Sequence, residues 1–152
     1  DAKNATKAAL IDGYVCGAGS AYLAASISLN KFIESADKSD ADTIQGMNIV
    51  ANALTKITKQ LGDNSNDVGD VILRDVATAL EKEEVPVTGY DAVNNKIVNL
   101  YDAGIIDATS VVINSLEKAS SIASTVTMTA TVVTEQAEDS DKINWSLAMN
   151  RR

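Results

Sequence analysis

Apolar residues recur at intervals of three and four between residues 42 and 61, and this spacing constrains the fold more than any other feature of the chain. They are Ile44, Met47, Val50, Ala51, Leu54, Ile57 and Leu61. This period places them on one face of an α-helix. We therefore expect an amphipathic helix from Asp42 to Gln60 that buries this stripe, with Ser39 or Asp42 as its N-cap and Gly62 in the C′ position.

Four other segments also predict helices. The chain opens with an apolar-periodic segment that runs into a glycine turn at residues 17–19, and residues 20–33 are apolar around most of their circumference, which is typical of burial. Further helices are expected over residues 68–82 and 108–127. The last of these should bury the stripe Val112, Leu116, Ala119, Ile122, Ala123 and Val126.

Three segments depart from the helical pattern. Residues 85–101 are short, β-branched runs around Gly89 and predict a two-stranded hairpin, although residues 92–96 also fit a helical turn. Strict alternation over residues 127–134 predicts a C-terminal strand. Charged residues become more frequent from residue 135 to residue 152, where we expect a frayed tail. The fold class is therefore mainly α with minor β, in a single domain.

Composition narrows the possible functions. Hydrophobic residues make up 45% of the 152 residues but aromatic ones only 4%, so small aliphatic side chains must fill the core. A net charge of -8 disfavours nucleic acid as a partner, because a phosphate backbone would be repelled. With no histidine, the chain lacks the ligands of a common zinc site and the base of a His-containing triad.

The single cysteine, Cys16, cannot form an internal disulfide, and we interpret it as a small buried side chain in an intracellular or organelle-matrix protein. The uncharged run over residues 13–30 contains too many glycines and serines for a membrane span or a signal sequence. Because the chain opens on Asp1 rather than Met and has no N-cap before its first periodic residues, we expect it to be cut from a longer protein.

Three short elements are candidates for ligand chemistry: the Gly17-Ala18-Gly19 turn, the segment around Asp91, and Asp107. A glycine turn presents bare backbone N–H groups to an anion, although such a turn between helices is more often a plain connection. Asp107 has two interpretations. It could cap the next helix, worth about 1 kcal/mol, or its carboxylate could accept the hydroxyls of a ribose.

The order of these elements resembles the C-terminal half of a group I (GroEL-like) chaperonin subunit. Four blocks carry the resemblance: Gly13-Tyr14-Val15-Cys16-Gly17-Ala18-Gly19, Gly89-Tyr90-Asp91-Ala92, Gly104-Ile105-Ile106-Asp107-Ala108-Thr109 and Ala119-Ser120-Ser121-Ile122-Ala123. The resemblance implies a helical equatorial-domain fragment. Residues 1–12 would end an intermediate-domain helix, residues 13–136 would form the C-terminal half of the equatorial ATP-binding domain, and residues 137–152 would be a tail.

The resemblance also implies roles for individual residues. Asp1 matches the aspartate that positions the hydrolytic water and helps to coordinate the metal. Gly17, Ala18 and Gly19 match the triple-glycine turn against the nucleotide, Asp91 and Ala92 match the pair beside the adenine, and Asp107 matches the aspartate that holds the ribose.

Several departures mark a divergent member of the family, which we expect to be organellar. Ala18 adds a methyl group where the family has its middle glycine, Asp91 replaces an amide with a charge, and Ala108 stands where proline is expected at the first helical position. The Gly-Gly-Met tail typical of the family is absent.

The resemblance implies an ATP-dependent chaperonin that assists protein folding, with ATP or ADP and Mg²⁺ as cofactors of the intact protein. Its partners would be other subunits of a homo-oligomeric ring, a co-chaperonin and unfolded polypeptides, the last two through domains that this chain lacks, and not nucleic acid or membranes. The compartment would be the bacterial cytoplasm or the matrix of a mitochondrion or plastid, not the secreted space.

The family's phosphate-binding Gly-Asp-Gly-Thr-Thr loop is not in this sequence. We therefore expect the isolated chain to bind no nucleotide, to be inactive as an ATPase and to associate with itself through uncovered apolar faces. The alternative interpretation is a stand-alone helical interaction module without nucleotide chemistry. A stand-alone enzyme comes third, because no nucleophile-base pair is evident.

Overall fold

The computed structural model describes residues 2–37, 39–131 and 133. The chain is mainly helical with small strands, which confirms the predicted class. In order its elements are α1 (Ala2–Asp12), β1 (Tyr14–Cys16), α2 (Ser20–Ser35), α3 (Ala41–Asn64), α4 (Gly69–Leu80), β2 (Thr88–Asp91), β3 (Lys96–Asn99), β4 (Ile106–Ala108) and α5 (Thr109–Met128). Residues up to Leu116 form one compact unit, and a second begins at Glu117.

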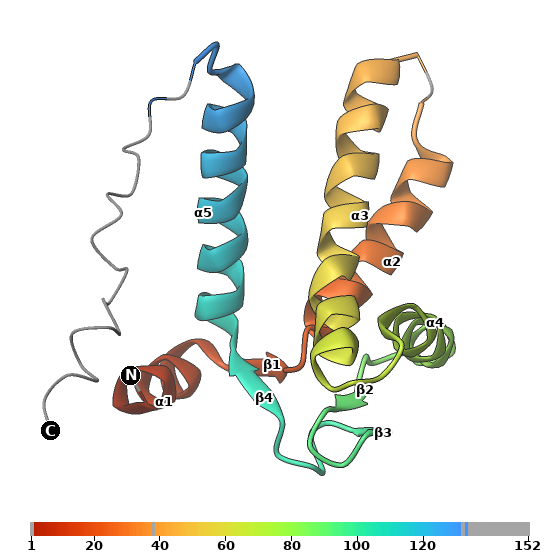
Figure 1. Cartoon of the computed structure of the whole chain (residues 1–152), viewed down its shortest axis with the longest axis vertical. Helices are drawn as coiled ribbons and strands as arrows, with labels where there is room; N and C mark the ends of the chain where they lie inside the picture. The colour runs from red at the N-terminus through yellow and green to blue at the C-terminus, as the bar shows by residue number, and fades with distance from the viewer. Residues whose placement is uncertain (1, 38, 132, 134–152) are drawn as a thin grey trace, which may run out of the picture. The chain divides into compact units, whose positions relative to one another are not determined.

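Three helices and a strand of the first unit surround its core. Helices α2 and α3 lie side by side and antiparallel, and α4 packs against both (Figure 1). The core cluster consists of Leu23, Ile72, Val76, Leu80 and Tyr90. Four of these five side chains are aliphatic, as the composition predicted. Burial of these side chains therefore holds α2, α4 and β2 together.

Helix α3 buries Ala51 and Leu54 of the predicted stripe, but its other buried residues differ from the prediction. Its buried residues are Ala51, Leu54, Thr58 and Gly62, whereas Val50 is 42% and Ile57 47% exposed. The prediction followed apolar residues alone, but small residues at positions 58 and 62 let the neighbouring helices approach closely. The predicted stripe is therefore wrong at Val50 and Ile57.

The ends of α3 also differ from the prediction. Asp40 is the N-cap, and its Oδ1 accepts a hydrogen bond from the Thr43 amide at 3.1 Å, so neither Ser39 nor Asp42 has this role. Gly62 lies inside the helix, which continues to Asn64. A Cβ at Gly62 would come within 2.9 Å of the Gly69 Cα, so the glycine permits contact between α3 and α4 rather than ending α3.

The strands form two antiparallel pairs. Strands β2 and β3 make the predicted hairpin, with Thr88 opposite Asn99. Strands β1 and β4 also pair, with Val15 opposite Asp107. The sequence did not predict this second pair, because each strand has three residues and its partner lies far along the chain.

Helix α5 begins at Thr109, so Asp107 lies inside β4 and is not the N-cap. The predicted buried stripe of this helix is wrong, since α5 has no buried residue. Leu116 is 39%, Ile122 65% and Val126 59% exposed. The stripe has the period of a buried face, but its residues are not buried.

The predicted strand over residues 127–134 is wrong wherever the structure describes it. Thr127 and Met128 complete α5, and residues 129–131 and 133 form no strand. The Thr127 hydroxyl donates to the Ala123 carbonyl at 2.8 Å and so bonds back into the helix. A segment with alternating apolar and polar residues gains little stability from an extended conformation when it has no partner strand. The predicted tail, residues 135–152, lies outside the described residues.

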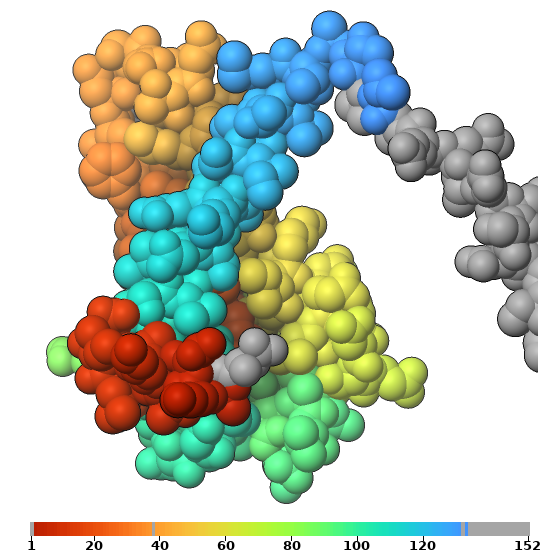
Figure 2. Space-filling model, turned by 90° about the vertical axis from the view of Figure 1, so that its left-hand side faces the viewer, coloured from red at the N-terminus to blue at the C-terminus, as the bar shows by residue number. Residues whose placement is uncertain are grey.

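Helix α1 packs beside β4 and lies on the surface in Figure 2, where it is red. None of its described residues is buried, and Leu10 and Ile11 are 82% and 69% exposed. Over the residues that the structure describes, no helix combines the length and the apolar character that crossing a bilayer requires.

Candidate functional site

The turn at residues 17–19 joins β1 to α2 and forms one side of the site. The Gly17 amide donates to the Ile105 carbonyl at 3.0 Å, and the Ser20 amide donates to the Gly17 carbonyl at 2.9 Å. Ala18 and Gly19 have φ angles of 52° and 76°, in the left-handed region. The turn therefore needs two successive residues in a conformation that favours glycine.

Gly19 also meets α3 at close range. A Cβ at this position would lie 2.9 Å from both Ile57 Cγ2 and Thr58 Oγ1. Two features therefore require glycine at position 19: the positive φ angle, and the close contact between the turn and α3. Ala18 carries a methyl group, and that group lines the pocket described below.

The turn leads directly into the N-terminus of α2. Gly19 is the N-cap and supplies no side-chain acceptor to the first amides of the helix. Free amides and the helix dipole give such a terminus a partial positive charge. An anion can approach it closely across the small residues of the turn.

The pairing of β1 with β4 places Asp107 beside the turn at residues 17–19. Its partner in the register is Val15, two residues before the turn. The Tyr22 hydroxyl of α2 donates to the Val112 carbonyl of α5 at 3.0 Å, and this bond ties the start of α5 to α2. Pairing of the strands and this tie together hold the carboxylate beside the glycine turn.

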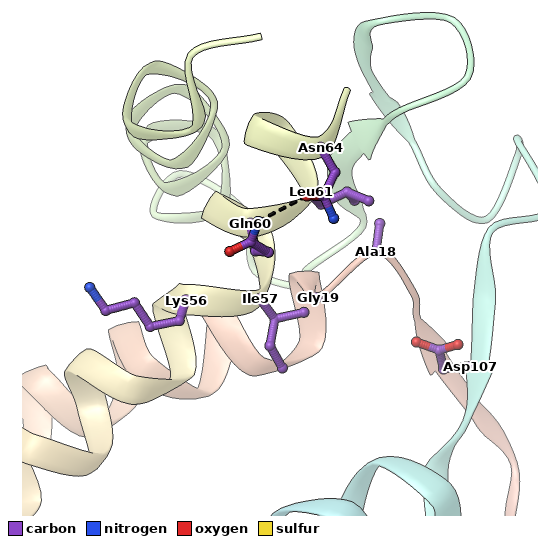
Figure 3. A pocket seen from close by; sticks show the side chains of 8 residues that line it. All are labelled: Ala18, Gly19, Lys56, Ile57, Gln60, Leu61, Asn64 and Asp107. Atoms are coloured by element: carbon purple, nitrogen blue, oxygen red, sulfur yellow. Dashed lines mark hydrogen bonds between the residues drawn. The ribbon is translucent and has the colours of Figure 1, made fainter. Parts of the chain in front are cut away.

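The turn, Asp107 and α3 border a widely open pocket of about 630 Å³. Its lining comprises Ala18, Gly19, Lys56, Ile57, Gln60, Leu61, Asn64 and Asp107 (Figure 3). The α3 residues were not predicted as site residues. A signal for them exists, because positions 56, 57, 60, 61 and 64 share one side of a helix, but Ile57 and Leu61 were assigned to the core.

The structure does not bring all the predicted site residues to this pocket. Gly17, Asp91 and Ala92 do not line it. The Asp91 carboxylate accepts hydrogen bonds from the Val93 amide at 2.9 Å, the Asn94 amide at 3.2 Å and Asn94 Nδ2 at 2.7 Å. The bond from the Asn94 side chain, followed by that from the Val93 amide, holds the pKa of Asp91 below its usual value. The hydrogen bonds of the Asp91 carboxylate are therefore made within the turn between β2 and β3.

Asp1, the predicted catalytic and metal-binding residue, lies outside the described residues. Within the described ranges, no three His, Cys, Asp or Glu side chains gather closely enough to hold a metal ion. The assignment of Asp1 to metal and water stays a prediction.

Cys16 is buried as predicted, with 3% of its surface exposed. Its thiol donates to the Pro86 carbonyl at 3.2 Å. Burial raises the pKa of the thiol above its usual value, which keeps it protonated and poorly reactive. Cys16 therefore packs β1 against the segment before β2.

With this geometry in view, comparison with protein-family models matches residues 1–137 to the TCP-1/cpn60 chaperonin family. The chain belongs to the TCP-1/cpn60 chaperonin family. The match includes the glycine turn, Asp107 and the whole α3 wall of the pocket.

The fold of this chaperonin family member is also similar to a solved structure. That structure is the open-state monomer of a group II chaperonin from Methanococcoides burtonii, with a TM-score of 0.64 and 19% sequence identity. The similarity covers 70% of this chain and 26% of that one. The chain thus spans about a quarter of the length of the chaperonin monomer it matches, and at this identity the likeness shows the fold alone.

Proposed function

We propose that this chain forms part of the nucleotide site of a longer chaperonin subunit, which uses ATP to assist the folding of other proteins. The observation that supports this proposal is that one pocket is lined by both Asp107 and the turn before α2. Asp107 and the turn, which the sequence predicts as site residues from separate parts of the chain, therefore lie close together in this member of the chaperonin family. The family match supports the parent function.

The pocket has suitable chemistry for two parts of a nucleotide. The Asp107 carboxylate can accept hydrogen bonds from the vicinal hydroxyls of a ribose. The turn and the N-terminus of α2 offer amides and a partial positive charge to the phosphate chain. The exposed Ile57 and the half-buried Leu61 offer an apolar surface for the flat face of a base.

The residues present do not make a complete triphosphate and Mg²⁺ site by themselves. The metal assignment depends on Asp1 alone, and the family's phosphate-binding loop is not in this sequence. Mg²⁺, when bound in the complete subunit, neutralises charge on the phosphates. We propose that this chain contributes the sugar and turn contacts and that another part of the subunit contributes the rest.

The proposal extends to the assembly. The parent would form a homo-oligomeric ring of the group I type, with a co-chaperonin and unfolded polypeptides bound through other domains, in the bacterial cytoplasm or an organelle matrix. The sequence blocks described above support the group I assignment. Roles for Asp91 and Ala92 beside the adenine remain part of the resemblance, because neither residue lines the pocket.

The direct test is nucleotide binding by the complete protein. Titration calorimetry with Mg²⁺ and ATP should show binding that weakens about 10- to 100-fold in Asp107→Ala, the usual size of a hydrogen bond to a charged group. Asp102→Ala is the matched control, because Asp102 is also an exposed aspartate but does not line the pocket. Equal binding by the Asp107→Ala variant and the unaltered protein would contradict the proposed site.

The alternative function, a helical interaction module without nucleotide chemistry, is favoured by exposed apolar residues such as Leu10 and Ile122. Its distinguishing property is thermodynamic. A protein that binds a nucleotide in the folded state gains stability as the nucleotide concentration rises, whereas the module would not. A melting temperature of the complete protein that is independent of ATP would support the module.

A further inference from the structure

Two amide side chains on the α3 wall of the pocket form a pair. Gln60 Nε2 donates a hydrogen bond to Asn64 Oδ1 at 2.8 Å, one helical turn away. Both residues are exposed, and both line the pocket. Figure 3 shows their side chains on one side of the pocket and those of Ala18 and Asp107 on the other. The pair therefore faces the proposed sugar and turn contacts.

Besides Gln60 and Asn64, the polar side chains that line the pocket are those of Lys56 and Asp107. The Lys56 side chain extends away from Ala18 and Asp107 in Figure 3. The Asp91 carboxylate is bonded to Val93 and Asn94 in its own turn. Asp107 is assigned to the sugar in the proposed function. The Gln60–Asn64 pair is therefore the polar group best placed to contact another part of a bound nucleotide.

The bond between the two amides leaves a defined set of groups for a ligand. Gln60 retains its carbonyl oxygen and one N–H, and Asn64 retains its N–H groups. An amide oxygen beside an amide N–H matches the edge of adenine, which places the N6 donor next to the N7 acceptor. Guanine presents two acceptors, O6 and N7, at that edge, so the amide oxygen would face an acceptor.

We propose that Gln60, held in position by Asn64, contacts the edge of the nucleotide base and selects adenine over guanine. This inference rests on the proposed nucleotide site and adds to it a residue that sets specificity. Gln60 contacts the base, while Asn64 acts through Gln60 as a positioning residue. The side chains of Ile57 and Leu61 cover the face of the same base.

The test is the ratio of ATP to GTP affinity in the complete protein, measured by titration calorimetry with each nucleotide and Mg²⁺. Gln60→Leu should lower this ratio by about tenfold or more, the size of one bidentate amide contact to a base. Asn64→Ala should lower it in the same direction by a smaller factor, because Gln60 then loses its support. Asn52→Leu removes an exposed amide from the same helix outside the pocket and should leave the ratio unchanged.

The outcomes separate this inference from the proposed function. Asp107→Ala should weaken ATP and GTP equally, because both carry the same ribose. If the unaltered protein binds neither nucleotide, the proposed site and this inference both fail. If Asp107→Ala weakens both nucleotides but Gln60→Leu leaves their ratio unchanged, only the inference fails. Because Gln60 is exposed, the variant should keep the circular dichroism spectrum and melting temperature of the folded protein.

Discussion

At the scale of single residues, Gly19 is the tightest point of the proposed site. Its φ of 76° disfavours any side chain, and a Cβ there would lie 2.9 Å from Thr58 Oγ1. We predict that Gly19→Ala lowers the free energy of unfolding by about 2–4 kcal/mol, through backbone strain and overpacking together. Urea denaturation of the chain measures this loss.

Gly104→Ala is the matched control for Gly19→Ala. Gly104 has a similar φ of 70°, but a Cβ there would have no neighbour within 4 Å. We expect a cost of about 1 kcal/mol from the backbone alone. Equal losses in the two variants would show that the approach of the turn to α3 is not as close as described.

Glu83 fixes the segment before β2. Its carboxylate accepts hydrogen bonds from the Val87 amide at 2.9 Å, the Thr88 amide at 3.2 Å and the Thr88 hydroxyl. Burial alone would raise the pKa of Glu83, but the bonds from Thr88 and Val87 outweigh it and lower the pKa below its ordinary value of 4.5. A carboxyl group with a lowered pKa stabilises the fold above its unfolded pKa, and this stability is lost as pH falls through the folded value.

We therefore predict that the free energy of unfolding decreases as pH falls from about 6 to about 3, and that Glu83→Gln makes this decrease smaller. Urea titrations at several pH values measure both slopes. Glu84→Gln is the control, because Glu84 is the adjacent exposed glutamate. Full pH dependence in both variants, equal to that of the unaltered chain, would contradict this role of Glu83.

The sequence could indicate only part of the pocket. Ala18, Gly19 and Asp107 were found because their residue types at this spacing carry the family resemblance. The α3 wall was missed because Ile57 and Leu61 fit the helical period of a core face. Periodicity identifies a helix face but does not say whether a neighbouring chain segment or a pocket lies against it.

At the scale of elements, the contact between α3 and α4 depends on Gly62. A Cβ there would meet the Gly69 Cα at 2.9 Å and Ile72 Cγ1 at 3.2 Å. We predict that Gly62→Ala destabilises the chain by about 1–2 kcal/mol, because overpacking of about 1–3 kcal/mol exceeds the gain in helix propensity of up to about 1 kcal/mol. Thermal or urea unfolding provides the measurement.

Gly46→Ala is the matched control for Gly62→Ala: it is the same substitution in α3, at a position where α4 is not in contact. Gly46 is exposed in α3, and a Cβ there would have nothing within 4 Å. We expect this variant to be more stable than the unaltered chain by about 0.5–1 kcal/mol. Opposite signs for the two variants follow from the described contact, and a stabilising Gly62→Ala would rule that contact out.

The helices were more predictable than the strands. Helices α2, α3, α4 and α5 are long enough for their period to appear in the sequence, and the β2–β3 hairpin has a short connection. Strands β1 and β4 have three residues each and pair across most of the chain, so no local pattern reveals them. The strand predicted at residue 127 failed because alternation needs a partner strand, and Thr127 bonds back to Ala123 instead.

At the scale of the whole molecule, the exposed apolar residues of α5 predict self-association of this chain. Ile122 and Val126, one turn apart, are 65% and 59% exposed, and the face has the period of a buried one. Analytical ultracentrifugation should detect oligomers that dissociate on dilution. The double variant Ile122→Lys with Val126→Lys should shift the equilibrium toward monomer, whereas Ser121→Lys, on the same exposed helix, should not.

A chain that stays strictly monomeric at high concentration would contradict this prediction. It would also mean that the period of α5 is no evidence of a covered face. Dissociation by Ser121→Lys as well would point to net charge rather than to the apolar face.

A cryo-electron microscopy map of the complete protein with Mg²⁺ and a non-hydrolysable ATP analogue would test the proposed nucleotide site most directly. We predict that the ribose lies within hydrogen-bond distance of the Asp107 carboxylate and that the phosphate chain leaves along the Gly17–Gly19 turn. A nucleotide bound at a place that neither Asp107 nor this turn contacts would contradict this prediction.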